Sequence, residues 1–237
     1  MAASVPKLRR AIKNKAPGIG FEQELWDSGY DVVVGIDEVG RGAWAGPISV
    51  GAAVVPKERR VYKVRDSKML TEDEREALFD RISGWVETWA VGHASHTECD
   101  ELGMSEAQIL ATRRALDGLA REPSFALVDG KWDFVKVLRT KRIVRGDAKS
   151  LSIAAASILA KVSRDRLMRQ QALEHPGYNF ENNKGYPCPL QKEALADRGP
   201  SSIHRRSWAF MDNLVDDRFE RYVRPDPQMS LFETEAG

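Results

Sequence analysis

The stretch DVVVGIDEVGRGAWAGP, residues 31–47, constrains the fold of this chain more than any other part of the sequence. Its apolar run, VVVGI, is typical of a buried strand, and two adjacent carboxylates, Asp37 and Glu38, stand at the end of that run. Neighbouring side chains on a strand point to opposite faces, so a core strand should carry at most one of two adjacent acids inward. The pair is therefore expected where the chain leaves the sheet, just before a glycine-rich turn.

The bulk composition sets broad limits on the class of protein. The length of 237 residues suits one large domain or a domain with an appendage, and 42% hydrophobic and 30% charged residues suit a sizeable core and an ordinary surface. The formal net charge of +1 does not indicate a nucleic-acid partner, so any basic surface must be local. Two distant cysteines, Cys99 and Cys188, provide no zinc spacing and no disulfide framework, which favours a reducing cytoplasm. No apolar run approaches the roughly 20 residues of a membrane span, and the basic N-terminus lacks the apolar segment of a secretory signal.

The order of the predicted elements indicates a mixed sheet. Strands are expected at residues 32–37, 48–55, 85–96, 125–129 and 141–145, and helices at a capping box from residue 71, then at 105–121, 153–174, 190–197 and 207–221. Three strands joined by short connections precede two that return through crossovers, so the first and fourth strands can lie side by side and parallel. We expect a basic flexible arm at residues 1–25, a catalytic domain at 26–175, a helical extension at 176–222 and a flexible tail at 223–237.

Three acids are expected to meet at one edge of this sheet. The ends of the first and fourth strands carry Asp37 and Asp129 and should lie about 4.8 Å apart. Asp147, in RGDAKS before the long helix, can fold back to the same edge. Unpaired buried carboxylates are costly, and a hard divalent cation resolves their repulsion. From spacing alone, Asp147 could instead cap the helix, and Asp129 with Gly130 could form a turn.

Several long motifs together resemble one family. GIDEVGRGAWAGP, RDSKMLT, LVDG, RGDAKSLSIAAASILAKVSRD and KGYP followed by HRRSW occur in the order and at separations compatible with bacterial ribonuclease HII, over roughly residues 31–210. The resemblance implies an α/β, ribonuclease H-like fold: a mixed five-stranded sheet flanked by helices, with a small helical C-terminal extension. It implies an endonuclease that hydrolyses the RNA strand of RNA/DNA hybrids and incises 5′ of single ribonucleotides in duplex DNA, leaving a 3′-hydroxyl and a 5′-phosphate.

The resemblance also implies the metal ligands. The four metal-binding acids of the family fall on Asp37, Glu38, Asp129 and Asp147, so Mg²⁺ or Mn²⁺ is expected as cofactor. In a two-metal mechanism, one ion activates the attacking water and the other stabilises the leaving 3′ oxygen. No histidine pair is then required, which agrees with a chain that has only four histidines.

The glycine-rich loop has a second possible interpretation, as a dinucleotide-binding turn. The spacing GRGAWAG puts three residues before the last glycine rather than two, and Pro47 leads into another strand, so that interpretation is weak. Glycines permit close approach of the backbone to a ligand, and the 2′-hydroxyl distinguishes RNA from DNA. In the family this loop, here Gly40, Arg41 and Gly42, grips the ribose and the neighbouring phosphate.

Tyr186, in NKGYPCP, matches the family tyrosine that stacks on the sugar next to the cut; otherwise it would be a structural tyrosine beside Pro187. Cys188 and Gln191 depart from the family's common threonine and histidine at these places. Asp165, in SRD, is expected to orient neighbouring structure rather than to bind metal.

Basic residues near the motifs are candidates for phosphate binding. Lys68, Lys149 and Lys184 lie in or next to motifs, and local basic runs occur at residues 139–145 and 204–206. Such charges would supply sequence-independent, salt-sensitive affinity for nucleic acid. Charge runs are also often plain solvated faces, and that alternative stays open for each residue.

The C-terminal tail carries a second motif. Residues 228–232, QMSLF, resemble the pentapeptide by which bacterial replication and repair proteins dock on the DNA sliding clamp. Gln228 would fix the register while Leu231 and Phe232 enter a preformed pocket. Alternatively, Phe232 packs back on its own domain.

Three other functions are possible. Ribonuclease HIII normally adds an N-terminal substrate-binding domain, for which the roughly 30 residues before the first strand leave no room. A catalytically silent hybrid-binding module would not need all four acids. A generic nuclease or transposase of similar fold would share the acids but not the glycine loop and the tyrosine. A monomer is expected.

Overall fold

The computed structural model describes residues 16–58, 64, 70–214 and 219–225. Four residues singled out above, Lys68, Gln228, Leu231 and Phe232, lie outside the described residues.

The centre of the molecule is a five-stranded mixed sheet with the strand order β3-β2-β1-β4-β5. The strands are β1 (Val33–Val39), β2 (Ile48–Val54), β3 (Thr88–Ala94), β4 (Phe125–Asp129) and β5 (Thr140–Ile143). The pairs β1–β2 and β2–β3 are antiparallel, whereas β1–β4 and β4–β5 are parallel. The predicted fold class is confirmed, including the parallel contact between the first and fourth strands.

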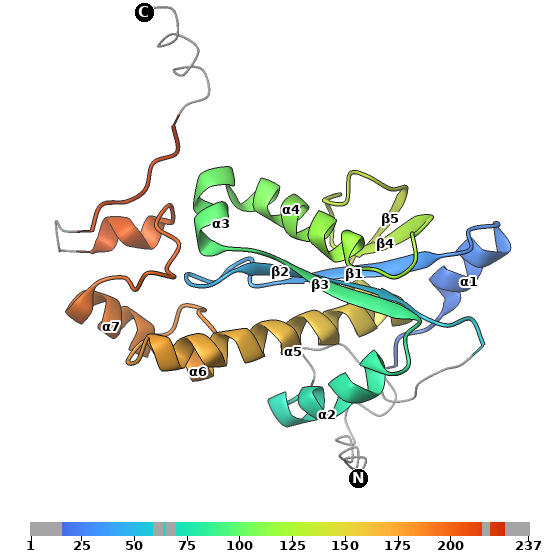
Figure 1. The fold of residues 1–237 in the computed structure, drawn as a ribbon, viewed down its shortest axis with the longest axis horizontal. Helices are drawn as coiled ribbons and strands as arrows, with labels where there is room; N and C mark the ends of the chain where they lie inside the picture. Colours follow the sequence, from blue (N-terminus) through green and yellow to red (C-terminus); the bar gives the residue numbers. More distant parts are fainter. Residues whose placement is uncertain (1–15, 59–63, 65–69, 215–218, 226–237) are drawn as a thin grey trace, which may run out of the picture.

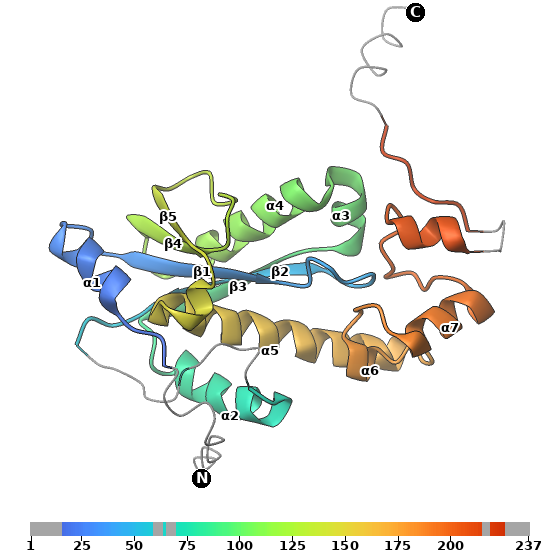
Figure 2. The same cartoon turned by 180° about the vertical axis from the view of Figure 1, so that it is seen from behind.

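Helices cover both faces of the sheet (Figures 1 and 2). On one face lie α3 (His96–Leu102) and α4 (Met104–Asp117), and on the other lies the long α5 (Leu151–Glu174), with α2 (Glu72–Ser83) packed on its outer side. One core forms between the sheet and α4, and a second between the sheet, α5 and α2.

Two glycines allow α5 to lie directly on the sheet. A Cβ at Gly35 of β1 would collide with the backbone of Ser152, and one at Gly51 of β2 would collide with the carbonyl of Ala156. The alanine-rich start of α5 supplies the matching small side chains. As a result α5 runs along β1 toward the end that carries Asp37, which brings residues of its second and third turns to that end.

The N-terminal region differs from the sequence-based expectation. Helix α1 (Gly20–Asp27) contains residue 25, where a flexible arm was expected to end. Its Glu22 is completely buried against the start of α5, and Gly18 forms an isolated bridge with Ser150. The segment from residue 16 is therefore part of the domain described here.

The C-terminal region forms a smaller cluster beyond the end of α5. It contains α6 (Phe180–Asn183), α7 (Pro189–Arg198) and the 3₁₀ turn η4 (Ala209–Asn213). A longer helix was expected at residues 207–221, but the described part is helical only in η4. The buried Asp100 accepts hydrogen bonds from the backbone N–H groups of Arg206 and Ser207, which holds the chain in an irregular path before η4.

One further difference concerns the third strand. The expected third strand, 85–96, begins only at Thr88, and it ends at Ala94 because Ser95 and Glu98 form a capping box that begins α3. The capping box predicted at Thr71 is present and begins α2. Among the described helices, none is both long enough and apolar enough to cross a membrane.

Candidate active site

Three acids from separate segments converge at one end of the sheet. Asp37 lies near the end of β1, Asp129 ends β4, and Asp147 lies in the 3₁₀ turn η3 (Gly146–Ala148). One carboxylate oxygen of each lies within 4.8 Å of those of the other two. The parallel register, with Ile36 opposite Val128, places the first two side by side.

Local geometry explains how Asp147 reaches the sheet. The backbone N–H of Gly146 donates a hydrogen bond of 2.6 Å to the Oδ1 atom of Asp129. Arg145, at φ 56°, adopts the left-handed conformation that turns the chain sharply before η3. Asp147 therefore neither caps α5, which Ser150 does, nor stands apart from the other acids.

Glu38 joins the site from the position next to Asp37. Its backbone N–H donates a 2.8 Å hydrogen bond to Oδ1 of Asp37, and it lines the same pocket as Asp37 and Asp129. The cluster with oxygens within 4.8 Å consists of the three aspartates, and the charge of Glu38 acts on Asp37 from the lining of the same pocket.

The electrostatics of the site favour a bound cation. The pKa of Asp37 is raised well above its usual range, first because the carboxyl group is buried, then because of the charge on Glu38. Asp129 and Asp147 raise this pKa further, whereas a hydrogen bond with Ser157 lowers it. Like charges held close together at oxygen ligands match the preference of Mg²⁺ and Mn²⁺. The residues present thus fit a hard divalent cation.

Asp37, Glu38 and Asp129 line a pocket of roughly 310 Å³. The remaining lining residues come from the glycine loop, from the start of α2, from α5 and from the tyrosine loop: Val39, Gly40, Arg41, Gly42, Arg75, Ser157, Lys161 and Tyr186. The structure therefore brings three of the predicted acids, the glycine loop and the tyrosine to a single pocket, and the Asp147 carboxylate lies next to those of Asp37 and Asp129.

The glycine loop and the tyrosine loop are tied to each other. The Tyr186 hydroxyl accepts a 2.9 Å hydrogen bond from the backbone N–H of Gly40, and the N–H of Trp44 donates to the carbonyl of Gly185 at 2.7 Å. Gly40 has a φ of +89°, and a Cβ there would collide with the guanidinium of Arg164. The loop thus requires glycine both for its conformation and for space.

A buried arginine that the sequence analysis did not single out joins these loops. Arg164 of α5 donates hydrogen bonds to the carbonyls of Pro47, Lys184 and Ala45, at 2.9, 2.9 and 3.1 Å. Its guanidinium also lies 5.4 Å from the centre of the Tyr186 ring. The only signal in the sequence was the position of this arginine within the SRD motif, next to Asp165.

The predicted phosphate-binding residues divide into different environments. Lys149 is exposed next to the Asp147 turn. The Arg41 side chain donates to Gln108 and lies 5.4 Å from the centre of the Trp132 ring. Lys184 is turned away from the pocket, with its ammonium bound to Glu72 at 3.3 Å and to the carbonyl of Glu181.

The basic run at residues 204–206 is not the solvated phosphate-binding strip that charge alone suggested. His204 and Arg205 are buried, and Arg205 donates to the carbonyls of Gly46 and Arg41 at 3.0 and 3.1 Å. Two cations missed in the sequence, Arg75 and Lys161, line the pocket instead. Lys161 could have been found from the spacing of four residues between it and Asp165 on one helix face.

Cys188 and Gln191, which differ from the residues common in the resembled family, fit into the hydrogen bonding at the start of α7. The Sγ atom of Cys188 accepts from the backbone N–H of Gln191 at 3.4 Å, as a cap of α7, and from Asn183 at the same distance. The Asn183 side chain also accepts from the N–H of Gly185 at 2.8 Å, next to Tyr186. The tyrosine loop is therefore anchored on both sides.

Comparison with known proteins shows what the chain is similar to. The sequence model of the family described as Ribonuclease HII matches residues 34–211. A Ribonuclease HII from Streptomyces avermitilis is 43% identical over 210 residues, which cover 88% of this chain and 90% of that protein. The crystal structure of ribonuclease H2 from Pyrococcus horikoshii aligns with a TM-score of 0.68 at 29% identity, covering 80% of this chain and 99% of the other. RNase HII in the PCNA:RNase HII complex from Archaeoglobus fulgidus aligns with a TM-score of 0.65 at 27% identity, covering 78% and 97%.

Proposed function

The chain belongs to the ribonuclease HII family of endonucleases acting on the RNA of RNA/DNA hybrids, and we propose that it also incises duplex DNA on the 5′ side of a single embedded ribonucleotide. The products would be a 3′-hydroxyl and a 5′-phosphate. One observation carries the proposal: the oxygens of Asp37, Asp129 and Asp147 lie within 4.8 Å of one another, in the neighbourhood of a pocket that Gly40 and Tyr186 also line.

The acids would hold the metal. Asp37, Asp129 and Asp147 would be its ligands, together with Glu38 of the same pocket, and the oxygen donors suit Mg²⁺ or Mn²⁺. Two such ions would supply the chemistry of a lowered pKa for the attacking water and of charge stabilisation at the leaving 3′ oxygen. Ser157, which forms a hydrogen bond with Asp37, would help to fix the direction of that carboxylate.

The neighbouring loops would select the ribose. The backbone of Gly40, Arg41 and Gly42 can approach a sugar closely, because no side chain at the glycines intervenes. Tyr186 would place its ring on the sugar next to the cut, with its hydroxyl held by Gly40. Arg164 fixes both loops through three carbonyls, so the gap between them is preformed rather than assembled on binding.

A duplex DNA with one ribonucleotide tests the proposal. We expect a single cut on the 5′ side of the ribonucleotide, with the stated end groups, that disappears with a chelator and nearly disappears in Asp37→Asn. An all-DNA duplex cut at the same rate would contradict ribose selection. A catalytically silent hybrid-binding module would bind the substrate and leave it intact under every condition.

We also propose that the tail binds the DNA sliding clamp through Gln228, Leu231 and Phe232. The sequence QMSLF supports this, together with the solved complex of the Archaeoglobus fulgidus RNase HII with PCNA. A peptide of residues 223–237 should bind the bacterial clamp, and Leu231→Ala with Phe232→Ala in the full chain should abolish clamp binding without changing nuclease activity. Unchanged clamp binding by the double variant would contradict clamp binding and leave the proposed nuclease activity unaffected.

We propose in addition that the protein is cytoplasmic and monomeric.

A further inference from the structure

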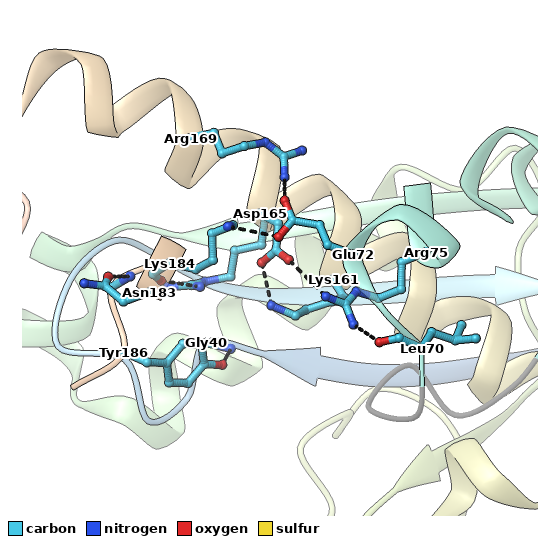
Figure 3. Close-up of polar contacts among 12 residues, drawn as sticks. Gly40, Leu70, Glu72, Arg75, Lys161, Asp165, Arg169, Asn183, Lys184 and Tyr186 are labelled. Atoms are coloured by element: carbon cyan, nitrogen blue, oxygen red, sulfur yellow. Dashed lines mark hydrogen bonds and ion pairs between the residues drawn. The ribbon is translucent and has the colours of Figure 1, made fainter. Parts of the chain in front are cut away.

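A buried carboxylate, Asp165, lies next to two cations of the pocket that also contains the acids. The side chain of Asp165 on α5 is only 3% exposed. Its Oδ1 atom lies 2.6 Å from Nζ of Lys161, one turn earlier on the same helix, and its Oδ2 atom lies 3.9 Å from a guanidinium nitrogen of Arg75 on α2 (Figure 3). Lys161 and Arg75 both line the pocket, whereas Asp165 lies behind them.

Asp165, Lys161 and Arg75 together carry a net positive charge. Two cations and one carboxylate give a net charge of +1 beside a pocket that Asp37, Glu38 and Asp129 also line. The pKa of Lys161 is lowered, first by burial and also by the charge of Arg75, so the two cations repel each other. Without the carboxylate between them, the two cations would separate and turn toward water.

Asp165 also lies where α2 docks on α5. The second amino group of Arg75 donates to the carbonyl of Leu70 at 2.6 Å. Farther from the pocket, Glu72 pairs with Arg169 and with Lys184, and Glu76 pairs with Arg166 at 2.6 Å (Figure 3 shows the first two). The ion pairs of Glu72 and Glu76 hold the helix in place, while the pair with Asp165 sets the direction of an arginine that faces the pocket.

We propose that Asp165 is a positioning residue, which holds Lys161 and Arg75 together so that both bind one phosphate of the nucleic-acid strand opposite the acids. The proposal rests on the function proposed above and adds a phosphate site to it. A planar guanidinium and an ammonium group that both donate to oxygens of the same phosphate form strong, charge-assisted hydrogen bonds.

The direction in which Asp165→Asn changes the affinity for substrate distinguishes a positioning role from a purely electrostatic one. Asp165→Asn removes a negative charge near a polyanion, so charge alone predicts tighter binding of the substrate. If Asp165 positions the two cations, the same variant binds no tighter, and cleavage falls by about 100-fold because the phosphate is misplaced. Glu76→Gln is the matched control, since it removes a carboxylate from the same helix interface away from the pocket.

The experiment measures binding and cleavage separately, with a duplex DNA that contains one ribonucleotide. Dissociation constants come from fluorescence anisotropy over a salt series, in proteins that also carry Asp37→Asn. Lys161→Met and Arg75→Gln should each reduce the slope of log K against log salt by about 1, because each removes one phosphate contact. Asp165→Asn should reduce the slope by at least as much, and Glu76→Gln should leave it unchanged. Single-turnover cleavage is measured with Asp37 intact.

The outcomes distinguish the possibilities. Tighter binding by Asp165→Asn with an unchanged salt slope, or kinetics equal to those of Glu76→Gln, would overturn the proposal. If Asp165→Asn fails to fold, the variants Lys161→Met, Arg75→Gln and the double variant test the proposal instead. A loss of binding free energy in the double variant that is smaller than the sum of the two single losses supports one shared phosphate. A loss equal to that sum contradicts it. Failure of the wild type to cut any ribonucleotide-containing duplex would instead refute the proposed function, and the salt slopes would still report the phosphate contacts.

Discussion

The Tyr186 hydroxyl accepts a hydrogen bond of 2.9 Å from the backbone N–H of Gly40, a residue 146 positions earlier in the chain. This bond joins the loop after β1 to the loop after α6, and both residues line the pocket. The position of the phenol ring and the conformation of the glycine loop therefore depend on each other. We therefore expect a change in the tyrosine to alter the conformation of the glycine loop, and the reverse.

Tyr186→Phe tests that dependence. The variant keeps the ring but leaves the N–H of Gly40 without its partner, so we expect a loss of about 1 kcal/mol in the free energy of unfolding. Cleavage at a single ribonucleotide should fall by about tenfold, because the loop is less fixed. Tyr186→Ala, which also removes the ring, should lose far more activity. Steady-state kcat/KM measures the loss of activity, and urea denaturation measures the loss of stability. Equal kinetics for Tyr186→Phe and wild type would show that the hydroxyl is dispensable for cleavage.

Asp37→Asn should abolish cleavage and yet make the metal-free protein more stable. Burial and the charges of Glu38, Asp129 and Asp147 raise the pKa of Asp37, so its ionised form is unfavourable without a cation. An uncharged isostere relieves that repulsion, and we expect a gain of about 1 kcal/mol in the presence of a chelator. Added Mg²⁺ or Mn²⁺ should stabilise the wild type more than the variant. Thermal and urea unfolding with and without metal measure this, and a variant less stable than wild type in chelator would count against the repulsion.

The fold and the acid cluster were predictable because they follow from short-range patterns. The apolar runs before Asp37 and Asp129 indicate strands, and their order along the chain leaves few ways to arrange a mixed sheet. Once β1 and β4 lie parallel, their ends meet, and the observed register leaves little freedom for the two side chains.

Other features depend on packing that no local pattern encodes. Lys184 stands in a motif, as Lys161 does, but the left-handed backbone at Lys184 turns its side chain toward Glu72 on α2. Arg205 looks like a surface charge in the sequence, yet it is buried and bound to backbone carbonyls. The helix expected at residues 207–221 has suitable composition, but hydrogen bonds to Asp100, over 100 residues away, redirect the chain at its start.

His204 should make stability depend on pH in a defined window. It is buried among aromatic rings, and its Nδ1 atom accepts from the N–H of Ser201 at 2.9 Å. Burial holds the pKa of His204 at about 3, below the usual 6.5. Between these values the unfolded chain binds a proton that the folded protein does not, so stability falls as the pH falls from about 6.5, by up to about 1.4 kcal/mol per pH unit. His204→Gln should reduce that slope between pH 6.5 and 5 in urea denaturation, and identical slopes would refute the assignment.

Glu22 connects the first described helix to the candidate metal site. Its Oε1 atom accepts from the Ser150 hydroxyl at 2.6 Å, and from the backbone N–H and the hydroxyl of Ser152 at 2.9 and 2.7 Å. These residues form the start of α5, where a negative charge is also favoured by the helix dipole. Gly18 adds backbone hydrogen bonds on both sides of Ser150, so the chain just after Asp147 is held from the N-terminal segment.

Glu22→Gln should therefore weaken both the fold and the metal site. The variant keeps the size of the side chain but removes the charge from a buried carboxylate with three donors, so we expect a loss of about 2–4 kcal/mol in the free energy of unfolding. Calorimetric titration with Mn²⁺ should show lower affinity, because Asp147 is held less firmly. Glu24→Gln, on the same helix but largely exposed and paired with Lys141, is the matched control and should cost about 0.5 kcal/mol or less. If Glu22→Gln lost stability but bound Mn²⁺ as the wild type does, the start of α5 would have to hold Asp147 without help from Glu22, and the N-terminal segment would serve the fold alone.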